Sequence, residues 1–396
     1  MRIEHSPAPR QSDAGRRLLL LLFLLPCVAV TPAEAQLNFS GQVDLLARAG
    51  SDDRGLNRNF RLDSPYNLVR GRLFAQRWLT DDAGVFAEVL FDSESGPRLN
   101  GAYVVLNNIA GRDWLNVRAG LAPSLVGNFG LRSTYFNANP LIGVPLVWQH
   151  RTTLDAAGLT TASDLLRRRD SNVISLPMLY DACWNVQWEV MGEVGAFEYS
   201  LGITPGSMSN PTQSTLEDGV QVLGRVGFVP TPELRLGVSA GMGPYIAGTN
   251  RDPQTPATSF PGEPEDYQQR LIGWDAEYSR GRAILYSEGY LSSWEVPLVP
   301  EDVQAIGGYV EGRYDFLPAW FGALRVGTMH FSDVTAEDGA TTRTTGWDDD
   351  ILRIESSITY RLARELQIRA GWQHTEFLTG GEDAIDLFGV QLRAVF

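Results

Sequence analysis

The stretch Ile385-Asp386-Leu387-Phe388-Gly389-Val390-Gln391-Leu392-Arg393-Ala394-Val395-Phe396 alternates in polarity up to the last residue of the chain. Successive side chains of a strand point to opposite faces of the sheet. One face then carries Phe388, Val390, Leu392, Ala394 and Phe396. The other carries Gly389, Gln391 and Arg393. Because unpaired terminal strands fray, the pattern predicts that this strand closes a sheet by pairing with an earlier one.

The opposite end of the chain has the layout of a secretory signal peptide. Arg10, Arg16 and Arg17 precede an apolar run from Leu18 to Val30, and an Ala-x-Ala site follows at 33–35. The run is too short for a spanning helix. We therefore expect residues 1–35 to be cleaved and residues 36–396 to form one mature domain.

Downstream, charged residues make up 20% of the chain and interrupt every apolar run. No stretch is long enough for a transmembrane helix. Alternating segments near the length of a tilted membrane strand recur instead. We predict sixteen strands, at 37–49, 68–79, 85–92, 101–107, 114–122, 183–191, 196–204, 219–229, 234–243, 269–279, 282–291, 303–315, 321–331, 349–361, 365–376 and 385–396.

The connections between these strands alternate between long and short, as in 244–268 followed by 280–281. Short periplasmic turns on one rim and long extracellular loops on the other produce this rhythm. The fold class predicted is thus all-β, a transmembrane antiparallel β-barrel of about sixteen strands in a bacterial outer membrane. An even number of strands places both termini in the periplasm.

Each strand has one apolar and one polar face. In 349–361, for example, Leu352 and Ile354 oppose Arg353 and Glu355. An Arg facing lipid at the bilayer centre costs about 2–4 kcal/mol, so the polar faces are expected to point inward around water. Aromatic residues at strand ends are expected to face the membrane boundaries. This girdle comprises Trp78, Trp114, Phe228, Tyr278, Phe316, Trp320, Tyr360 and Phe396 on the periplasmic side, and Phe91, Trp184, Phe331 and Phe377 on the outer side.

Inward-facing charges define the candidate pore lining. The predicted residues are Arg48, Arg70, Arg72, Glu88, Arg118, Arg225, Asp275, Glu277, Glu311, Arg313, Arg325, Arg353, Glu355, Arg369 and Arg393. Charged side chains in a water-filled pore filter and guide ions. With the remaining inward charges of the wall the two signs nearly balance, which favours a general pore of modest preference. The alternative for each residue is an internal salt bridge that braces the wall.

The longest connection, 123–182, follows the fifth strand and in this position resembles the loop of general porins that folds inward, which implies that it constricts the pore. Its candidate constriction residues are Arg132, Arg151, Arg167, Arg168 and Arg169. The last three end a predicted short helix, Ser163 to Arg169, with Ser163 as N-cap. Two placements stay open for this cluster. In the lumen it would attract anions, whereas at the mouth it would pair with acidic groups or lipopolysaccharide phosphate.

Several stretches resemble known families. The C-terminal Phe on an alternating strand resembles the sorting signal of bacterial outer-membrane proteins. Residues 117–123 with Phe129-Gly130 resemble the strand-to-loop passage of general porins, although Pro123 is separated from Phe129. Residues 273–278 and 285–290 are similar to strand pairs in phosphate-selective porins of the O/P type. The resemblance implies an outer-membrane porin for passive diffusion of small hydrophilic solutes or ions, often as a homotrimer.

Two other functions stay open: a barrel that acts as a sheath or secretion partner for another protein, and an outer-membrane barrel hydrolase. His150, His330 and His374 show no metal-binding spacing, and we expect no metal, cofactor or catalytic residue. The formal net charge of −14 lies largely in acidic loops, which disfavours nucleic-acid binding and suits contact with lipopolysaccharide. Cys183 is alone in the mature chain.

Overall fold

The computed structural model describes residues 37–50, 56–58, 64–94, 96–134, 139–155, 161–180, 185–210, 219–246, 262–338, 341–380 and 383–396. The predicted signal peptide lies outside these residues, as do Cys183 and Trp184.

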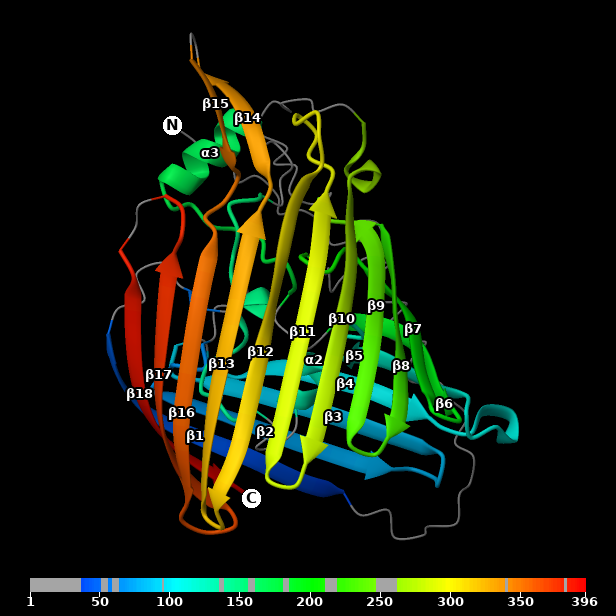
Figure 1. Ribbon diagram of the computed structural model, residues 1–396. Coiled ribbons are helices and arrows are strands. Elements are labelled where there is room, and N and C mark those ends of the chain that lie inside the picture. The colour runs from blue at the N-terminus through cyan, green and yellow to red at the C-terminus, as the bar shows by residue number, and fades with distance from the viewer. Residues whose placement is uncertain are drawn as a thin grey trace, which may run out of the picture. The chain divides into compact units, whose positions relative to one another are not determined.

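Sixteen antiparallel strands form one closed barrel (Figure 1). Going round the wall, each strand is hydrogen-bonded to the next in the order β1-β2-β3-β4-β5-β6-β7-β8-β9-β10-β11-β12-β13-β16-β17-β18 and back to β1. Their bounds are β1 (Asn38–Gly50), β2 (Val69–Trp78), β3 (Ala83–Asp92), β4 (Arg98–Leu106), β5 (Asn116–Ala122), β6 (Asn185–Val194), β7 (Phe197–Pro205), β8 (Val220–Thr231), β9 (Leu234–Pro244), β10 (Gln268–Arg280), β11 (Ala283–Trp294), β12 (Val303–Leu317), β13 (Trp320–Phe331), β16 (Ile351–Arg361), β17 (Leu366–Phe377) and β18 (Ile385–Val395). All sixteen predicted strands are confirmed, most within two or three residues at either end.

The C-terminal strand closes the barrel against the first one. β18 pairs with β1 from Gln42↔Val395 to Gly50↔Leu387. Phe396 continues the ladder, since Gly41 donates to its carbonyl at 2.8 Å and its amide donates to the Gly41 carbonyl at 3.0 Å. The Phe396 ring lies where a Cβ on Gly41 would stand, within 2.2 Å. Glycine at 41 therefore lets the final aromatic ring pack flat on the first strand.

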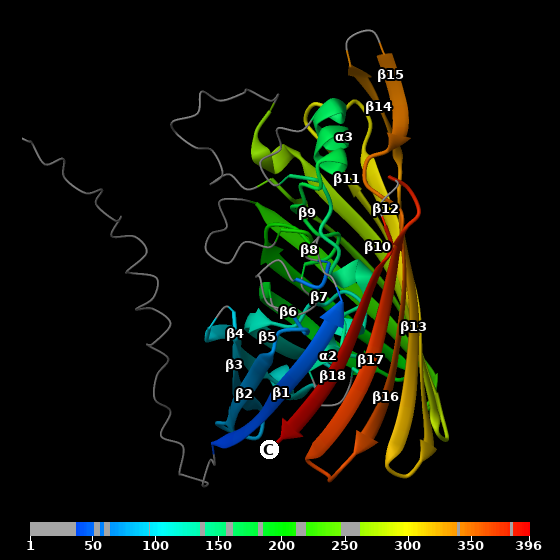
Figure 2. The ribbon, with the colours of Figure 1, turned by 90° about the vertical axis from the view of Figure 1, so that its left-hand side faces the viewer.

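A two-stranded hairpin outside the barrel was not predicted. β14 (Asp333–Asp338) pairs with β15 (Thr341–Gly346) and projects beyond the wall from the connection between β13 and β16 (Figures 1 and 2). In its first strand only two apolar residues, Val334 and Ala336, alternate with polar ones, and its threonine-rich second strand has none. A pattern search based on a half-buried strand therefore reads this segment as a loop.

The helical segments are short: η1 (Ile109–Gly111), α2 (Phe129–Thr134), η2 (Leu146–Trp148), α3 (Ala162–Asp170) and η4 (Pro264–Asp266). α3 is the predicted helix, but the predicted N-cap was wrong. Thr161 caps it through a capping box with Asp164, while the Ser163 hydroxyl donates to the Glu337 carbonyl of β14. None of the helices among the described residues has the length and apolar character needed to cross a membrane.

The barrel interior is only partly polar, which corrects the expectation of a wholly wet lumen. An apolar cluster joins the inner faces of β10–β13 to the segment after β5. Tyr290, Tyr309 and Met329 on the strands pack with Phe129 and Trp148 of that segment. The outer face is mostly apolar between the two rims, as shown by the exposed Val226, Val238, Ile272, Ile306, Val310 and Leu324. The strands therefore bury a dry interface on one side of the lumen and turn their other apolar face outward.

Three residues of the predicted aromatic girdle face inward instead. Phe331 and Phe377 are 7% and 6% exposed and belong to the inner apolar cluster. Trp78 lies opposite Gly84 and packs edge-on against Phe86, whose ring centroid is 5.8 Å away. The strand-end position alone could not reveal which face each aromatic ring occupies, because a shift of one residue reverses the face.

Candidate functional site

The candidate site is the lumen wall, and the alternation places all fifteen predicted lining residues on inner faces. They are Arg48, Arg70 and Arg72 on β1 and β2, Glu88 and Arg118 on β3 and β5, Arg225, Asp275 and Glu277 on β8 and β10, Glu311, Arg313 and Arg325 on β12 and β13, Arg353 and Glu355 on β16, and Arg369 and Arg393 on β17 and β18. Nine of them are at most 9% exposed: Glu88, Arg118, Asp275, Glu311, Arg325, Arg353, Glu355, Arg369 and Arg393. Most of the predicted set therefore contacts protein atoms.

Ion pairs between residues of the wall account for much of this burial. Arg393 binds Asp44 through two hydrogen bonds of 2.7 and 3.0 Å. Arg225 binds Asp275 in the same bidentate way, at 2.8 and 2.7 Å. Further pairs between strands join Arg72 to Glu88 at 2.5 Å and Arg118 to Glu189 at 2.6 Å, while Arg313 binds Asp315 of the same strand at 2.9 Å. Cross-strand pairs of opposite charge stabilise a sheet, so these residues brace the wall.

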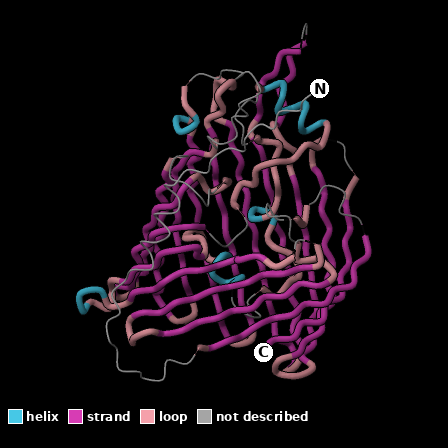
Figure 3. The backbone as a smooth tube through the Cα atoms, turned by 180° about the vertical axis from the view of Figure 1, so that it is seen from behind, coloured by secondary structure: helices cyan, strands magenta, loops and turns pink. Residues whose placement is uncertain are grey.

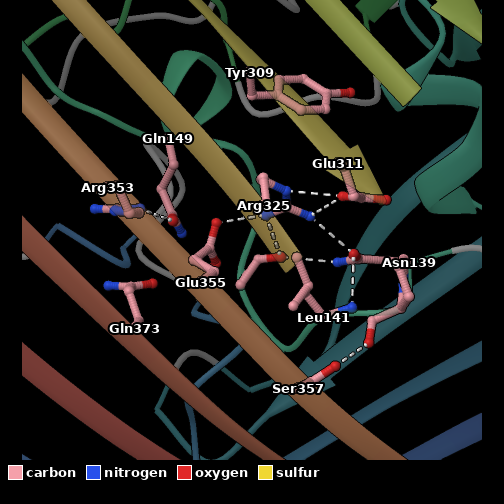
Figure 4. A network of polar contacts seen from close by, with 12 residues as sticks. Asn139, Leu141, Gln149, Tyr309, Glu311, Arg325, Arg353, Glu355, Ser357 and Gln373 are labelled. Atoms are coloured by element: carbon pink, nitrogen blue, oxygen red, sulfur yellow. Dashed lines mark hydrogen bonds and ion pairs between the residues drawn. The ribbon is translucent and has the colours of Figure 1, made fainter. Parts of the chain in front are cut away.

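The largest network joins the wall to the segment after β5 (Figure 4). Arg325 on β13 binds Glu311 of β12 at 2.6 Å and Glu355 of β16 at 2.8 Å. The other oxygen of Glu311 binds Arg132 of α2. Arg325 also donates to the Gly143 carbonyl at 3.2 Å and to the Asn139 side chain at 3.1 Å. Two arginines and two carboxylates thus form one neutral, buried cluster.

Further polar contacts hold the same segment along the wall. The Glu288 carboxylate of β11 accepts hydrogen bonds from the Asn128 and Phe129 amides at 2.7 and 2.6 Å, and from the Trp148 indole at 3.0 Å. Ser357 of β16 donates to the Pro140 carbonyl at 2.8 Å, and Arg369 of β17 donates to the Leu141 carbonyl at 2.8 Å. These hydrogen bonds pair the carbonyl and amide groups of the segment with side chains of the wall. The segment is therefore held against the wall inside the barrel.

Of the five predicted constriction residues, Arg132 binds a barrel strand directly through Glu311. Arg151 donates to the Ser175 carbonyl at 3.0 Å. Arg168 binds Asp155 at 2.9 Å and the Thr153 carbonyl at 2.7 Å. The contacts of Arg151 and Arg168 therefore lie within the connection between β5 and β6.

The other two arginines lie on α3, beside the β14–β15 hairpin (Figure 2). Arg169 donates to the Gly346 carbonyl at 2.5 Å and is 5% exposed. The Arg167 side chain is 74% exposed and pairs only with Asp164 of its own helix among the contacts described. The neighbouring Asp170 accepts a hydrogen bond from Arg343 of β15 at 2.7 Å, and this bond lowers the pKa of the Asp170 carboxyl. The cluster of Arg167, Arg168 and Arg169 therefore lies beside the hairpin, and its nearest acidic partners belong to its own connection between β5 and β6.

We expect Arg169→Ala to loosen the hairpin, because it removes the charged donor of the half-buried Gly346 carbonyl, a cost of about 1–3 kcal/mol. Arg167→Ala should change stability by less than about 0.5 kcal/mol, since its pair is exposed. The rate of tryptic cleavage after Arg343, measured on the folded barrel, distinguishes the two. Equal rates in both variants would show that Arg169 does not hold the hairpin.

The prediction missed inner-face residues that carry no charge. Phe74, Phe86 and Tyr103 lie on the same faces as Arg72 and Glu88. The parity of those charged neighbours could have found them, because residues two apart on a strand share a face. Within the described part of the chain, no group of three or more His, Cys, Asp or Glu side chains is arranged to hold a metal ion.

Comparisons with known proteins find similarity in structure. No protein-family model and no curated sequence matches the chain. Among solved structures, a loop L8 deletion mutant of OmpT, an outer membrane protein of Vibrio cholerae, matches with a TM-score of 0.56 at 14% identity, covering 91% of this chain and 99% of that chain. The anion-selective porin of Comamonas acidovorans matches with 0.55 at 14% identity, covering 92% and 100%. The outer membrane channel DcaP of Acinetobacter baumannii matches with 0.52 at 11% identity, covering 92% and 99%.

These matches establish the fold class: a closed sixteen-stranded antiparallel barrel of the outer-membrane porin type. At such low identities the similarity concerns architecture, and no activity follows from it residue by residue.

Proposed function

We propose that this chain is an outer-membrane porin through which small hydrophilic solutes or ions diffuse passively. One observation carries the proposal. The closed barrel turns apolar side chains outward and charged ones inward, and the segment after β5 lies inside it against part of the wall. Apolar exteriors of this kind are stable in lipid, and sixteen strands enclose a channel wider than side chains alone can fill.

The same proposal predicts how the barrel is secreted, oriented in the membrane and assembled. Residues 1–35 would direct secretion, and the short-turn end, where both barrel termini lie, would face the periplasm. The segment after β5, 123–182, would constrict the pore. Lipopolysaccharide would contact the acidic outer loops. The barrel would assemble as a homotrimer, an arrangement supported by the trimer form described for OmpT of Vibrio cholerae.

A narrower assignment, to the phosphate-selective O/P type, rests on the resemblance at 273–278 and 285–290. The pairing of most inner arginines with carboxylates adds no support for a phosphate path. The permeability of phosphate relative to chloride tests this assignment.

We expect the purified, detergent-folded barrel to insert into planar bilayers and to give stepwise ionic conductance at neutral pH. The expected preference between anions and cations is modest, because the inner charges are paired. Single-channel recording with a salt gradient gives both values. A folded barrel that inserts but passes no current would favour the alternative of a sheath whose lumen is occupied.

One arrangement bears on the hydrolase alternative. On the outer face of β13, the His330 imidazole lies 3.1 Å from Asp350 and 3.1 Å from the Thr328 hydroxyl. This resembles the acid–base–nucleophile order of a catalytic triad. However, Thr328 donates its hydroxyl proton to the Ile351 carbonyl at 3.0 Å. A nucleophile must hand that proton to the imidazole, so the contact fits a structural role, and we retain the porin.

A further inference from the structure

Arg369 of β17 is a buried cation that has no carboxylate partner among the described residues. It lies on the inner face of the wall and is 1% exposed. Its guanidinium donates to the Thr359 hydroxyl at 3.1 Å, the Leu141 carbonyl at 2.8 Å and the Gln391 side-chain oxygen at 3.4 Å. All three acceptors are neutral. These hydrogen bonds therefore satisfy part of the guanidinium but do not balance its positive charge.

The carboxylates that act most strongly on Arg369 are already used by other arginines. They are Asp44 and Glu311. Asp44 is bound by Arg393 through two hydrogen bonds, and Glu311 belongs to the neutral cluster around Arg325. A buried charge without a partner is costly, because the protein interior replaces its hydration poorly. Arg369 thus remains as an excess positive charge in this part of the wall.

Two buried donors beside this charge have no acceptor. The Nη2 atom of Arg369 has no hydrogen-bond partner, and neither has Nε2 of Gln367, which lies two residues earlier on the same face of β17. Gln367 is 5% exposed. Buried donors are nearly always paired with protein or with a bound species. Within the described part of the chain no protein atom fills this role, so the two nitrogens indicate a ligand that accepts hydrogen bonds.

The segment after β5 covers this region of the wall. Gly371 of β17 lies opposite Gly389 of β18, and the Cδ1 atom of Ile142 is 3.0 Å from the place where a Cβ on either glycine would stand. The neighbouring Leu141 is 1% exposed. β17 lies next to β18, whose C-terminal end is marked in Figure 3. The two glycines thus let the segment lie close to the wall beside Arg369, and bulk water is kept from the guanidinium.

We propose that Arg369 and Gln367 hold one small monovalent anion, a halide such as chloride, as a counter-ion inside the wall. A halide brings the single negative charge that Arg369 requires and accepts charge-assisted hydrogen bonds from both free donors. Water would accept the same hydrogen bonds but would leave the charge unbalanced. Phosphate brings several acceptor oxygens, most of which two donors would leave unpaired. The ion is a fixed part of the wall, so this inference does not depend on solute passage.

The test is the dependence of barrel stability on chloride. The barrel folded into phospholipid vesicles is unfolded with urea while potassium chloride replaces potassium gluconate at constant ionic strength. Stability should rise with chloride and then saturate, because the ion binds only the folded barrel. At a chloride concentration about ten times the dissociation constant, the unfolding equilibrium constant should fall about tenfold. A wild-type stability that does not depend on chloride overturns the site.

Two variants separate the charge from the second donor. Arg369→Gln removes the charge and should abolish the chloride dependence. Gln367→Leu keeps the charge and should raise the half-effective chloride concentration at least about tenfold, the factor equivalent to one hydrogen bond to a charged group. If Arg369→Gln does not fold, Gln367→Leu still decides, since an unchanged half-effective concentration overturns the site.

The matched control is Arg235→Gln, the same substitution on the inner face of β9. Arg235 is half-buried and pairs with Glu198 at 3.0 Å, so this variant should keep the wild-type chloride dependence. Equal loss in Arg235→Gln and Arg369→Gln would show general ionic screening in place of a bound ion, and would overturn the proposal. In crystals grown with bromide, an anomalous peak beside Arg369 locates the ion, and the absence of a peak there also overturns the site.

Discussion

Glu311→Gln is expected to release the internal segment from the wall and to increase single-channel conductance. Glu311 is fully buried and is the carboxylate that binds both Arg132 and Arg325. The substitution leaves an excess positive charge inside a cluster that is neutral in the wild type. Removing one partner of a buried ion pair costs about 3–5 kcal/mol, because the remaining charge is desolvated without compensation. The least costly relief is for Arg132 to leave the wall with α2.

Two measurements check this expectation. The folded form should be lost at a lower temperature on unheated gels, and bilayer recordings should show larger or fluctuating current steps. Glu365→Gln provides the control, since this carboxylate lies on an exposed turn and its side chain is 62% accessible. If Glu311→Gln matches the wild type in both measurements, the cluster does not fasten the segment.

Val310→Arg is expected to destabilise the barrel in lipid by about 2–4 kcal/mol, the cost of an arginine on the lipid face at the bilayer midplane. Val310 lies midway along β12, faces outward and is 59% exposed. Urea unfolding of the barrel folded into phospholipid vesicles measures the free energy. The effect tests directly whether the apolar outer face contacts lipid.

Gln304→Arg supplies the control on the same strand and the same face. Gln304 lies at the long-loop end of β12, and an arginine near the interface costs about 0–1 kcal/mol. Equal costs at the two positions would mean that the cost of an arginine does not depend on its position along the strand. That result is expected of a barrel that does not span a bilayer.

The strands were predictable from the sequence because a barrel strand in lipid has few acceptable patterns. An apolar outer face and a polar inner face force an alternation that survives even where single residues deviate, as in β16 with Leu352 and Ile354 outside and Arg353 and Glu355 inside. The β14–β15 hairpin escaped prediction because only Val334 and Ala336 of β14 bury apolar side chains, and two residues make too short an alternation to predict a strand.

The sequence predicted which charged residues lie on the inner face, but it did not predict which of them pair with one another. Charged residues on inner faces followed from parity, but whether Arg325 meets a solute or Glu311 depends on register and on where the internal segment lies. Ser163 was favoured as N-cap of α3 because its residue type suits that position, whereas Thr161 has both the extended backbone and the reciprocal Asp164. Local sequence preferences could not separate these two residues.

The sequence by itself determined the closed barrel, its strand count and the inward direction of its charges, because hydrocarbon tolerates neither unpaired backbone groups nor arginines. Only the tertiary structure decided which charges cancel one another, which part of the wall the segment after β5 contacts, and which aromatic rings at strand ends face inward. Those outcomes depend on contacts between residues more than a hundred positions apart, such as Arg132 with Glu311, and no local pattern encodes them.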